Sequence, residues 1–295
     1  MTPARPAPDT AARSLAHWSE AGRAEMEAFY ALARLDYQLL AAALDWPAVL
    51  SASAERAGGA PSLLDVACGS GKFPAALQRD TDLSGLPTIR YDLLDPSAFS
   101  ITEAAAVLQA PFAAGERFQT TLEELDEDAG PWDVVWATHA LYALEPANLA
   151  DAVARFRSAA GPESFSFIAQ GATDGHYLRI YEAFLAGVRE GEGTQYVASD
   201  DLIAELRRQG AEPQVRRIAY DHVIEATDTI VLEGYLQRCL FDDSLSLRQL
   251  LVAPVLGAYL ESQLDAAAGV YRFHQEVDCI VLAPEGVTVP WTVAS

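Results

Sequence analysis

A short apolar strand that runs directly into a glycine turn is the feature that most restricts what this chain can fold into. Residues 63–71 read Leu-Leu-Asp-Val-Ala-Cys-Gly-Ser-Gly and are followed by a predicted helix. Gly69 and Gly71 let the backbone approach a ligand without obstruction by a side chain. The amino end of the helix favours a negative group, whereas Asp65 at the strand end favours a cation or a hydrogen-bond donor. The segment predicts a ligand-binding turn, although glycine turns after strands also occur for structural reasons alone.

Predicted strands and helices alternate on both sides of this turn. An alternating order implies crossover connections and a parallel sheet with helices on both faces. We therefore predict an α/β fold, namely a Rossmann-like, doubly wound, seven-stranded sheet with an N-terminal helical cap and a helical insert before the last strand. The predicted strands are residues 62–67, 89–94, 132–137, 164–170, 217–225 and 276–282, and the helices between them are 73–79, 98–108 and 147–159.

Small residues with a Gly58-Gly59 pair mark a boundary at residues 51–61. We predict a tail and helical cap over residues 1–58, with the helical pattern spanning 12–50. The main domain is expected over 59–295, with a helical lid inserted at 229–270. A further helix should start with Ser199 as its N-cap, because acids follow in its first turn.

An acidic residue at the end of the second strand narrows the ligand class. Asp95 ends the segment Ile89-Arg-Tyr-Asp-Leu-Leu-Asp, 24 residues after Gly71. A carboxylate at that place can accept hydrogen bonds from both hydroxyls of a ribose. Asp92 competes for this role but lies in the middle of the strand, so we favour Asp95.

Two nucleotide-binding patterns are missing from the turn. A nicotinamide-binding fingerprint requires a third glycine where this chain has Pro74, and a P-loop requires Ser or Thr where it has Phe73. The segment Asp-Val-Ala-Cys-Gly-Ser-Gly instead resembles the first motif of class I S-adenosylmethionine-dependent methyltransferases, which usually have glycine at the position of Ala67. The resemblance implies that S-adenosylmethionine is the cofactor and that the main domain is a methyltransferase domain.

The region after the predicted strand 132–137 concerns the substrate. Thr138, His139 and Tyr142 follow that strand, at the edge of a parallel sheet where ligands bind. Methyltransferases that act on base or glutamine amides carry Asn/Asp-Pro-Pro-aromatic here, and this chain has Thr-His-Ala-Leu. A small-molecule substrate is favoured, with His139 as a candidate catalytic base because imidazole titrates near neutrality. Tyr142 is the second catalytic candidate, and a satisfied histidine at a strand end is the alternative for His139.

Several segments resemble the histamine N-methyltransferase family: residues 95–98, 132–142, 195–202 and 273–276. This resemblance implies that His139 and Gln275 touch the substrate. In that family a cap-helix glutamate binds the amine, and the nearest positions here are 36–38, with no clear match. Because these identities differ, histamine itself is not carried over. The set of residues expected at the cofactor is Asp65, Ala67, Gly69, Gly71, Asp95, Pro96, Ser100, Thr120, Thr121 and Thr138, with Thr120 or Thr121 on the adenine side.

Three further substrate contacts are predicted from position. Tyr30 and Tyr37 lie seven residues apart on one face of a cap helix, where core packing is the alternative. His176 follows the fifth strand in a glycine-flanked loop, where turn formation is the alternative.

Charge and composition exclude other partners. The chain has 20 basic and 42 acidic residues and a net charge of −22, which opposes binding to nucleic acid. No uncharged apolar run reaches the length of a membrane span. Three cysteines without metal-ligand spacing indicate a reduced, metal-free, cytoplasmic protein. The oligomeric state stays open.

The function predicted from the sequence is S-adenosylmethionine-dependent methyl transfer to a small molecule, with N-methylation favoured over O-methylation. Two alternatives are an S-adenosylmethionine-consuming cyclase or lyase that makes no methylated product, and a non-catalytic binding protein. A methyltransferase for protein or peptide side chains also stays open, since an acidic surface suits a basic peptide.

Overall fold

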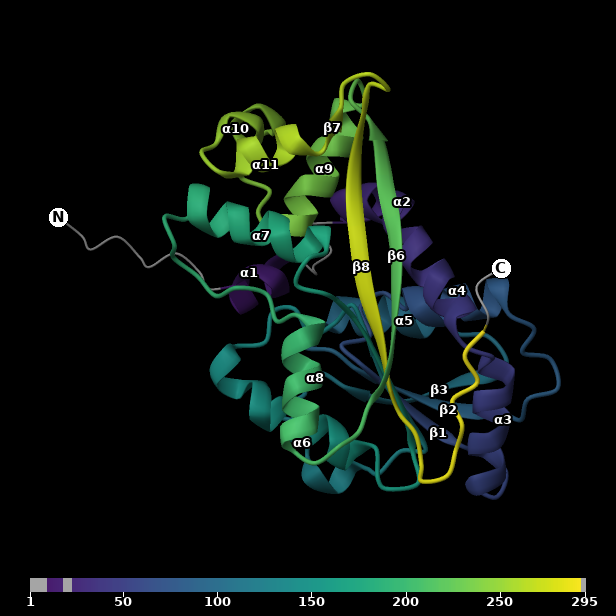
Figure 1. Ribbon diagram of the computed structural model, residues 1–295. Coiled ribbons are helices and arrows are strands. Elements are labelled where there is room, and N and C mark those ends of the chain that lie inside the picture. Colours follow the sequence, from purple (N-terminus) through teal and green to yellow (C-terminus); the bar gives the residue numbers. More distant parts are fainter. Residues whose placement is uncertain (1–9, 18–22, 293–295) are drawn as a thin grey trace.

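The computed structural model describes residues 10–17 and 23–292, with side chains described for 10–16 and 32–292. Its main feature is a single sheet in the order β3-β2-β1-β4-β5-β8-β6, with the two-residue strand β7 (Leu264–Asp265) paired to β8. Strands β1 to β5 are parallel, and β8 runs antiparallel to both β5 and β6. The predicted fold class is thereby confirmed (Figure 1). The main strands are β1 (Ser62–Val66), β2 (Ile89–Leu94), β3 (Phe112–Phe118), β4 (Val134–Thr138), β5 (Phe165–Gly171), β6 (Gln214–Glu225) and β8 (Val270–Leu282).

Helices cover both faces of the sheet. On one face lie α3 (Trp46–Arg56), α4 (Lys72–Asp80) and α5 (Ala98–Val107), and on the other lie α6 (Leu149–Ala159) and α8 (Ser199–Arg208). Trp46 packs edge-to-face on Trp136 and Phe167, with ring centroids 5.8 and 5.0 Å apart. Helix α3, which falls within the predicted cap, therefore packs against the sheet. Short 3-10 turns occupy Glu127–Ala129 and Pro146–Asn148.

A long β6/β8 hairpin extends beyond the rest of the sheet and carries a group of helices, which we call the roof. Residues Val277–Leu282 of β8 pair with β5, but β8 continues back to Val270, and this extension pairs with β6 beyond the end of β5. In Figure 1 the hairpin rises from the sheet as two long arrows with helices gathered around its tip. Those helices are α9 (Thr229–Leu240), α10 (Leu247–Val252) and α11 (Leu256–Ser262), with α7 (His176–Gly187) and α2 (Arg23–Ala43) beside them. Helix α1 (Thr10–His17) lies next to α7.

The roof has its own apolar core, formed mainly by α7, α9, α10, α11 and the upper part of β8. The helices of the predicted lid insert therefore bury one another as well as the hairpin. Among the described residues, none of the helices combines the length and apolar character that crossing a bilayer requires.

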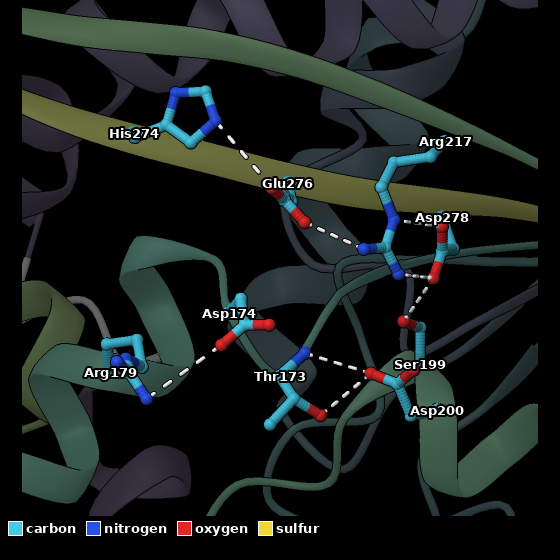
Figure 2. Close-up of polar contacts among 9 residues, drawn as sticks. All are labelled: Thr173, Asp174, Arg179, Ser199, Asp200, Arg217, His274, Glu276 and Asp278. Atoms are coloured by element: carbon cyan, nitrogen blue, oxygen red, sulfur yellow. Dashed lines mark hydrogen bonds and ion pairs between the residues drawn. The ribbon is translucent and has the colours of Figure 1, made fainter.

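Polar contacts fasten α8 to the hairpin (Figure 2). The Ser199 hydroxyl donates to Asp278 Oδ2 at 2.7 Å, and the Arg217 guanidinium donates to both carboxylate oxygens of Asp278 at 2.8 Å. Ser199 is thus the first helical residue rather than the predicted N-cap. Ala198 takes the N-cap position, and its backbone N–H donates to the Asp201 carboxylate at 2.9 Å. The hydroxyl that the sequence suggested for capping is used by β8 instead.

Candidate active site

A cavity of about 440 Å³ opens at the carboxyl ends of β1, β2 and β4, the edge at which open parallel sheets bind their ligands. Its volume lies within the range of small-molecule and cofactor sites. Seven of the ten residues predicted at the cofactor line it: Ala67, Gly69, Asp95, Pro96, Thr120, Thr121 and Thr138. The topology therefore brings together residues from segments that are about 70 positions apart in the chain.

Asp95 has its carboxylate fixed by backbone donors. Gly69 N–H donates to Oδ2 at 3.0 Å and Ser97 N–H donates to Oδ1 at 2.8 Å. A carboxylate offers about four lone-pair positions, so each oxygen keeps capacity for a further donor from the cavity. Burial raises the pKa of Asp95 to about 6, while the two backbone hydrogen bonds lower it. At neutral pH the group is mainly an ionised acceptor, as a pair of ribose hydroxyls requires.

Gly69 and Gly71 are needed in the turn for different reasons. A Cβ atom added to Gly69 would meet nothing within 4 Å, so the bare backbone faces the cavity. At Gly71, which lies just before α4, a Cβ atom would come within 2.6 Å of Val107 Cγ2 and 3.0 Å of Ala104 Cα. Gly71 does not line the cavity; its lack of a side chain allows the turn to pack against α5 instead. The expected close approach to a ligand therefore applies to Gly69.

Two other predicted cofactor residues lie outside the cavity wall. The Asp65 carboxylate accepts a hydrogen bond from the Tyr91 hydroxyl at 2.7 Å, and burial raises the pKa of Asp65 to about 7. Ser100 is buried in the first turn of α5, where its backbone N–H donates to Ser97 Oγ at 3.2 Å. Asp92, the competitor of Asp95, accepts from the Trp132 indole and the Glu116 backbone N–H inside the protein.

His139 lies at the boundary between this cavity and a smaller one of about 60 Å³, and its side chain lines both. Its backbone has a φ of 53°, in the left-handed region that non-glycine residues seldom adopt. His139 Nδ1 lies 2.9 Å from the Tyr142 hydroxyl, which also accepts a hydrogen bond from Gly171 N–H at 3.0 Å. Burial lowers the pKa of His139. Both predicted catalytic residues are therefore in contact.

Aromatic side chains wall the smaller cavity. Tyr37 lines both cavities, and its ring meets that of His139 at a centroid distance of 5.8 Å. Tyr30 falls within α2, but its side chain lies outside the part of the chain whose side chains the structure describes. The other aromatic residues that line the smaller cavity are Tyr142, Tyr177, Tyr196 and Phe241, of which only Tyr142 was predicted as a site residue.

Two predicted substrate contacts do not reach either cavity. His176 is buried at the start of α7, where Nδ1 lies 2.7 Å from the Tyr259 hydroxyl and burial holds its pKa well below the usual range. Gln275 is buried on β8 and donates from Nε2 to the Tyr235 hydroxyl at 3.1 Å. Both side chains stabilise the roof in this structure.

Sequence reasoning missed two parts of the site. Helix α1 supplies Ala11, Ala12, Ser14 and Leu15 to the cavity wall; the sequence predicts N-terminal helices that close over the site but singles out none of these residues. Asp36 lines the smaller cavity. The sequence analysis named it only as one of the positions nearest to the amine-binding glutamate of the histamine N-methyltransferase family. The available signal was that Asp36 is the only acid between residues 28 and 44 of a largely apolar helix. A buried carboxylate requires polar partners, so such a residue is a candidate for a buried polar site.

The residues in the larger cavity fit an adenosyl group. An acceptor carboxylate, an unobstructed backbone at Gly69 and the apolar walls Leu94, Leu141 and Leu144 stand around one space. Independent sequence comparison agrees: residues 64–165 match the family model described as "Methyltransferase domain". Within residues 64–165 the chain carries a methyltransferase domain. This match confirms the predicted enzyme class, a methyltransferase, and its S-adenosylmethionine cofactor.

Solved structures with low sequence identity share the methyltransferase fold. Magnesium protoporphyrin IX methyltransferase from Synechocystis, crystallised with S-adenosylhomocysteine, is 11% identical, with 92% of this chain and 99% of that chain covered and a TM-score of 0.51. A putative methyltransferase from Bacillus halodurans is 15% identical, with 76% and 92% covered and a TM-score of 0.50. No curated protein is detectably similar to the chain in sequence.

Proposed function

We propose that this methyltransferase transfers a methyl group from S-adenosylmethionine to a small molecule that enters beside His139. The observation that carries the proposal is the position of His139, which separates the cavity containing Asp95 and Gly69 from the smaller aromatic cavity. N-methylation is favoured over O-methylation by the resemblance of residues 95–98, 132–142, 195–202 and 273–276 to the histamine N-methyltransferase family. A cytoplasmic site of action remains part of the proposal.

The chain's own residues would act mainly by positioning. Bound S-adenosylmethionine supplies an activated methyl group whose leaving group is a neutral thioether. Asp95 would accept hydrogen bonds from the ribose, Thr120 or Thr121 would contact the adenine, and Thr138 would contact the cofactor. Holding a nucleophile in line with such a methyl group removes several kcal/mol of entropic cost from the barrier. Helix α1 covers the cavity and would exclude water from the reacting groups.

Calorimetry with S-adenosylhomocysteine tests the cofactor half. Asp95→Asn should weaken binding by about tenfold or more, because a hydrogen bond to a charged acceptor is worth roughly 1.5–3 kcal/mol. Asp92→Asn is the matched control, because Asp92 lies in β2 three residues before Asp95 and its carboxylate accepts from the Trp132 indole and the Glu116 backbone N–H. That variant should lose stability while keeping the wild-type affinity. Equal affinities for the wild type and Asp95→Asn would remove Asp95 from the site.

Product analysis tests the reaction. The purified enzyme is incubated with methyl-labelled S-adenosylmethionine and a metabolite pool from a cell extract, and the compound that gains the label is identified by mass. A methyltransferase releases S-adenosylhomocysteine together with a labelled small molecule. A cyclase or lyase would release methylthioadenosine with no labelled acceptor, and a binding protein would consume no cofactor.

A further inference from the structure

The two nitrogens of His139 have different surroundings. Nδ1 lies 2.9 Å from the Tyr142 hydroxyl oxygen. Nε2 is buried and has no hydrogen-bond partner within the part of the chain that the structure describes. His139 lines both cavities, and Nε2 is its one side-chain nitrogen without a partner among the described residues, so a molecule bound against the ring would engage this nitrogen.

The hydrogen bonds of Tyr142 decide which nitrogen carries the proton. Gly171 N–H donates to the phenol oxygen at 3.0 Å, so the oxygen is already an acceptor there. The phenol proton needs an acceptor of its own, and His139 Nδ1 is the remaining partner in the described structure. If Nδ1 carried a proton, the phenol oxygen would face two N–H donors and its own buried proton would have no acceptor. Leaving a buried donor unmatched is unfavourable, so the phenol donates to Nδ1.

Neutral imidazole has a single N–H, and an acceptor role for Nδ1 therefore places it on Nε2. Burial, the dominant influence on His139, lowers its pKa and so favours the neutral ring. The backbone keeps the ring in place, since His139 N–H donates to Ala169 O at 2.8 Å despite the positive φ. The result is a neutral histidine with its donor directed away from Tyr142.

We propose that Tyr142 holds His139 as the Nε2–H tautomer, so that His139 donates a hydrogen bond to a lone pair of the methyl acceptor rather than removing a proton from it. This inference rests on the proposed function, in which the acceptor binds beside His139. Its consequence is a substrate class: the acceptor carries an oxygen or a ring nitrogen with a free lone pair next to the atom that is methylated. That atom enters already deprotonated, because the neighbouring histidine has no free lone pair to receive a proton.

Nuclear magnetic resonance of the whole enzyme tests the tautomer without any turnover. Protein labelled with ¹⁵N in histidine is measured at pH 7.5, alone and with S-adenosylhomocysteine, and the His139 signals are assigned by their loss in His139→Gln. The expected pattern is a protonated, pyrrole-type Nε2 and an unprotonated, pyridine-type Nδ1. The reverse pattern, or a doubly protonated ring, overturns the proposal. If S-adenosylhomocysteine fails to bind, the proposed function fails while the tautomer is still reported by the free enzyme.

Tyr142→Phe should raise the Nδ1–H fraction of His139 at least severalfold, because the phenol donor is gone. The matched control is Tyr196→Phe, which removes a buried phenol whose hydrogen bond goes to Cys239 O at 2.9 Å rather than to His139. This control should leave the His139 signals unchanged. An unchanged tautomer in folded Tyr142→Phe contradicts the role of Tyr142, and the wild-type spectrum decides the tautomer if that variant does not fold.

Turnover of the labelled metabolite separates a donor from a base. His139→Gln keeps an N–H donor near the position of Nε2 and should retain activity within about tenfold of the wild type. His139→Leu keeps similar bulk without a donor and should lose at least a hundredfold. Equal and severe losses in both variants would instead indicate proton removal by His139 and overturn the donor role.

Discussion

Asp36 Oδ1 lies 2.6 Å from His222 Nε2, and both side chains are almost completely buried. These residues are 186 positions apart and join cap helix α2 to strand β6. The same carboxylate accepts from the Tyr177 hydroxyl at 2.9 Å, and His222 Nδ1 lies 3.0 Å from the Tyr235 hydroxyl. One buried polar network thus connects the cap, the hairpin, α7 and α9, and its members Asp36 and Tyr177 line the small cavity.

The Asp36–His222 contact should contribute strongly to stability. Asp36→Ala is expected to lower the free energy of unfolding by about 3 kcal/mol or more, since removal of one partner leaves the other buried without compensation. The neighbouring exposed pair Asp221–His274, at 2.8 Å, provides the control. Asp221→Ala should cost less than about 1 kcal/mol. Urea unfolding of both variants measures the difference, and equal losses would show that burial of the network does not matter.

Stability should fall as pH rises through the titration of Asp65. The pKa of Asp65 is raised by burial to about 7, above the value near 3.8 of an unfolded chain. The folded state therefore binds more protons than the unfolded state between about pH 4 and 7, so acidification over that window favours folding. Asp65→Asn should be more stable relative to the wild type at pH 8 than at pH 4, by on the order of 2–4 kcal/mol. Thermal or urea unfolding at the two pH values checks this, and a pH-independent difference would contradict it.

The two turn glycines should give opposite phenotypes when changed to alanine. Gly71→Ala brings its Cβ atom into α5 and should cost about 2–4 kcal/mol of stability through overpacking and left-handed strain. Gly69→Ala meets open space and should cost only about 1 kcal/mol. It should instead weaken S-adenosylhomocysteine binding, because the added methyl group enters the cavity. Unfolding and calorimetry on both variants provide the check; a larger loss of stability in Gly69→Ala would reverse the assignment.

Helix α1 should open more often when its anchor is removed. Thr10 Oγ1 donates to Thr194 O at 2.7 Å and lies 2.9 Å from the Tyr181 hydroxyl, while Arg13 also contacts Tyr181. Thr10→Val should increase amide hydrogen exchange over residues 10–17 by roughly tenfold, the equivalent of one or two lost hydrogen bonds. Thr102→Val, the same change on an exposed position of α5, should leave that exchange unchanged. Mass spectrometry measures both, and an unaltered rate in Thr10→Val would remove Thr10 as the anchor.

The parallel half of the fold could be predicted because its strands are buried on both faces and read as short apolar runs. β2 agrees with its predicted residues 89–94. Strand β3 was missed because Phe-Ala-Ala-Gly-Glu-Arg-Phe lies at the sheet edge, with only Phe112 buried, so that neither an apolar run nor an alternation remains. β8 begins at Val270, six residues before its predicted start, since polar residues such as His274 are exposed on the extended hairpin.

The candidate site was predicted where a residue's place along a strand determines its location. Asp95 directly follows β2 and Thr138 is the last residue of β4, and both line the cavity. Orientation about a strand could not be predicted in the same way, because a sheet covered on both faces gives no alternation of polar and apolar residues. The sequence around Asp65 therefore did not indicate that its carboxylate contacts Tyr91 within the sheet rather than the cavity. The α1 wall and the Asp36–His222 contact depend on packing between distant segments and leave no local pattern.

The extension of β6 and β8 past the end of β5 separates two tasks in space. The cavity that contains Asp95 lies on strands whose lengths are set by the parallel sheet. The helices around the smaller cavity are carried by a ribbon whose extension has only the two-residue strand β7 beside it. Residues can be inserted or removed near the ribbon tip, together with α10 and α11, without shifting the Asp95 end of the sheet. Evolution could thus change the size of the smaller cavity for a new methyl acceptor while the cavity around Asp95 and Gly69 stays the same.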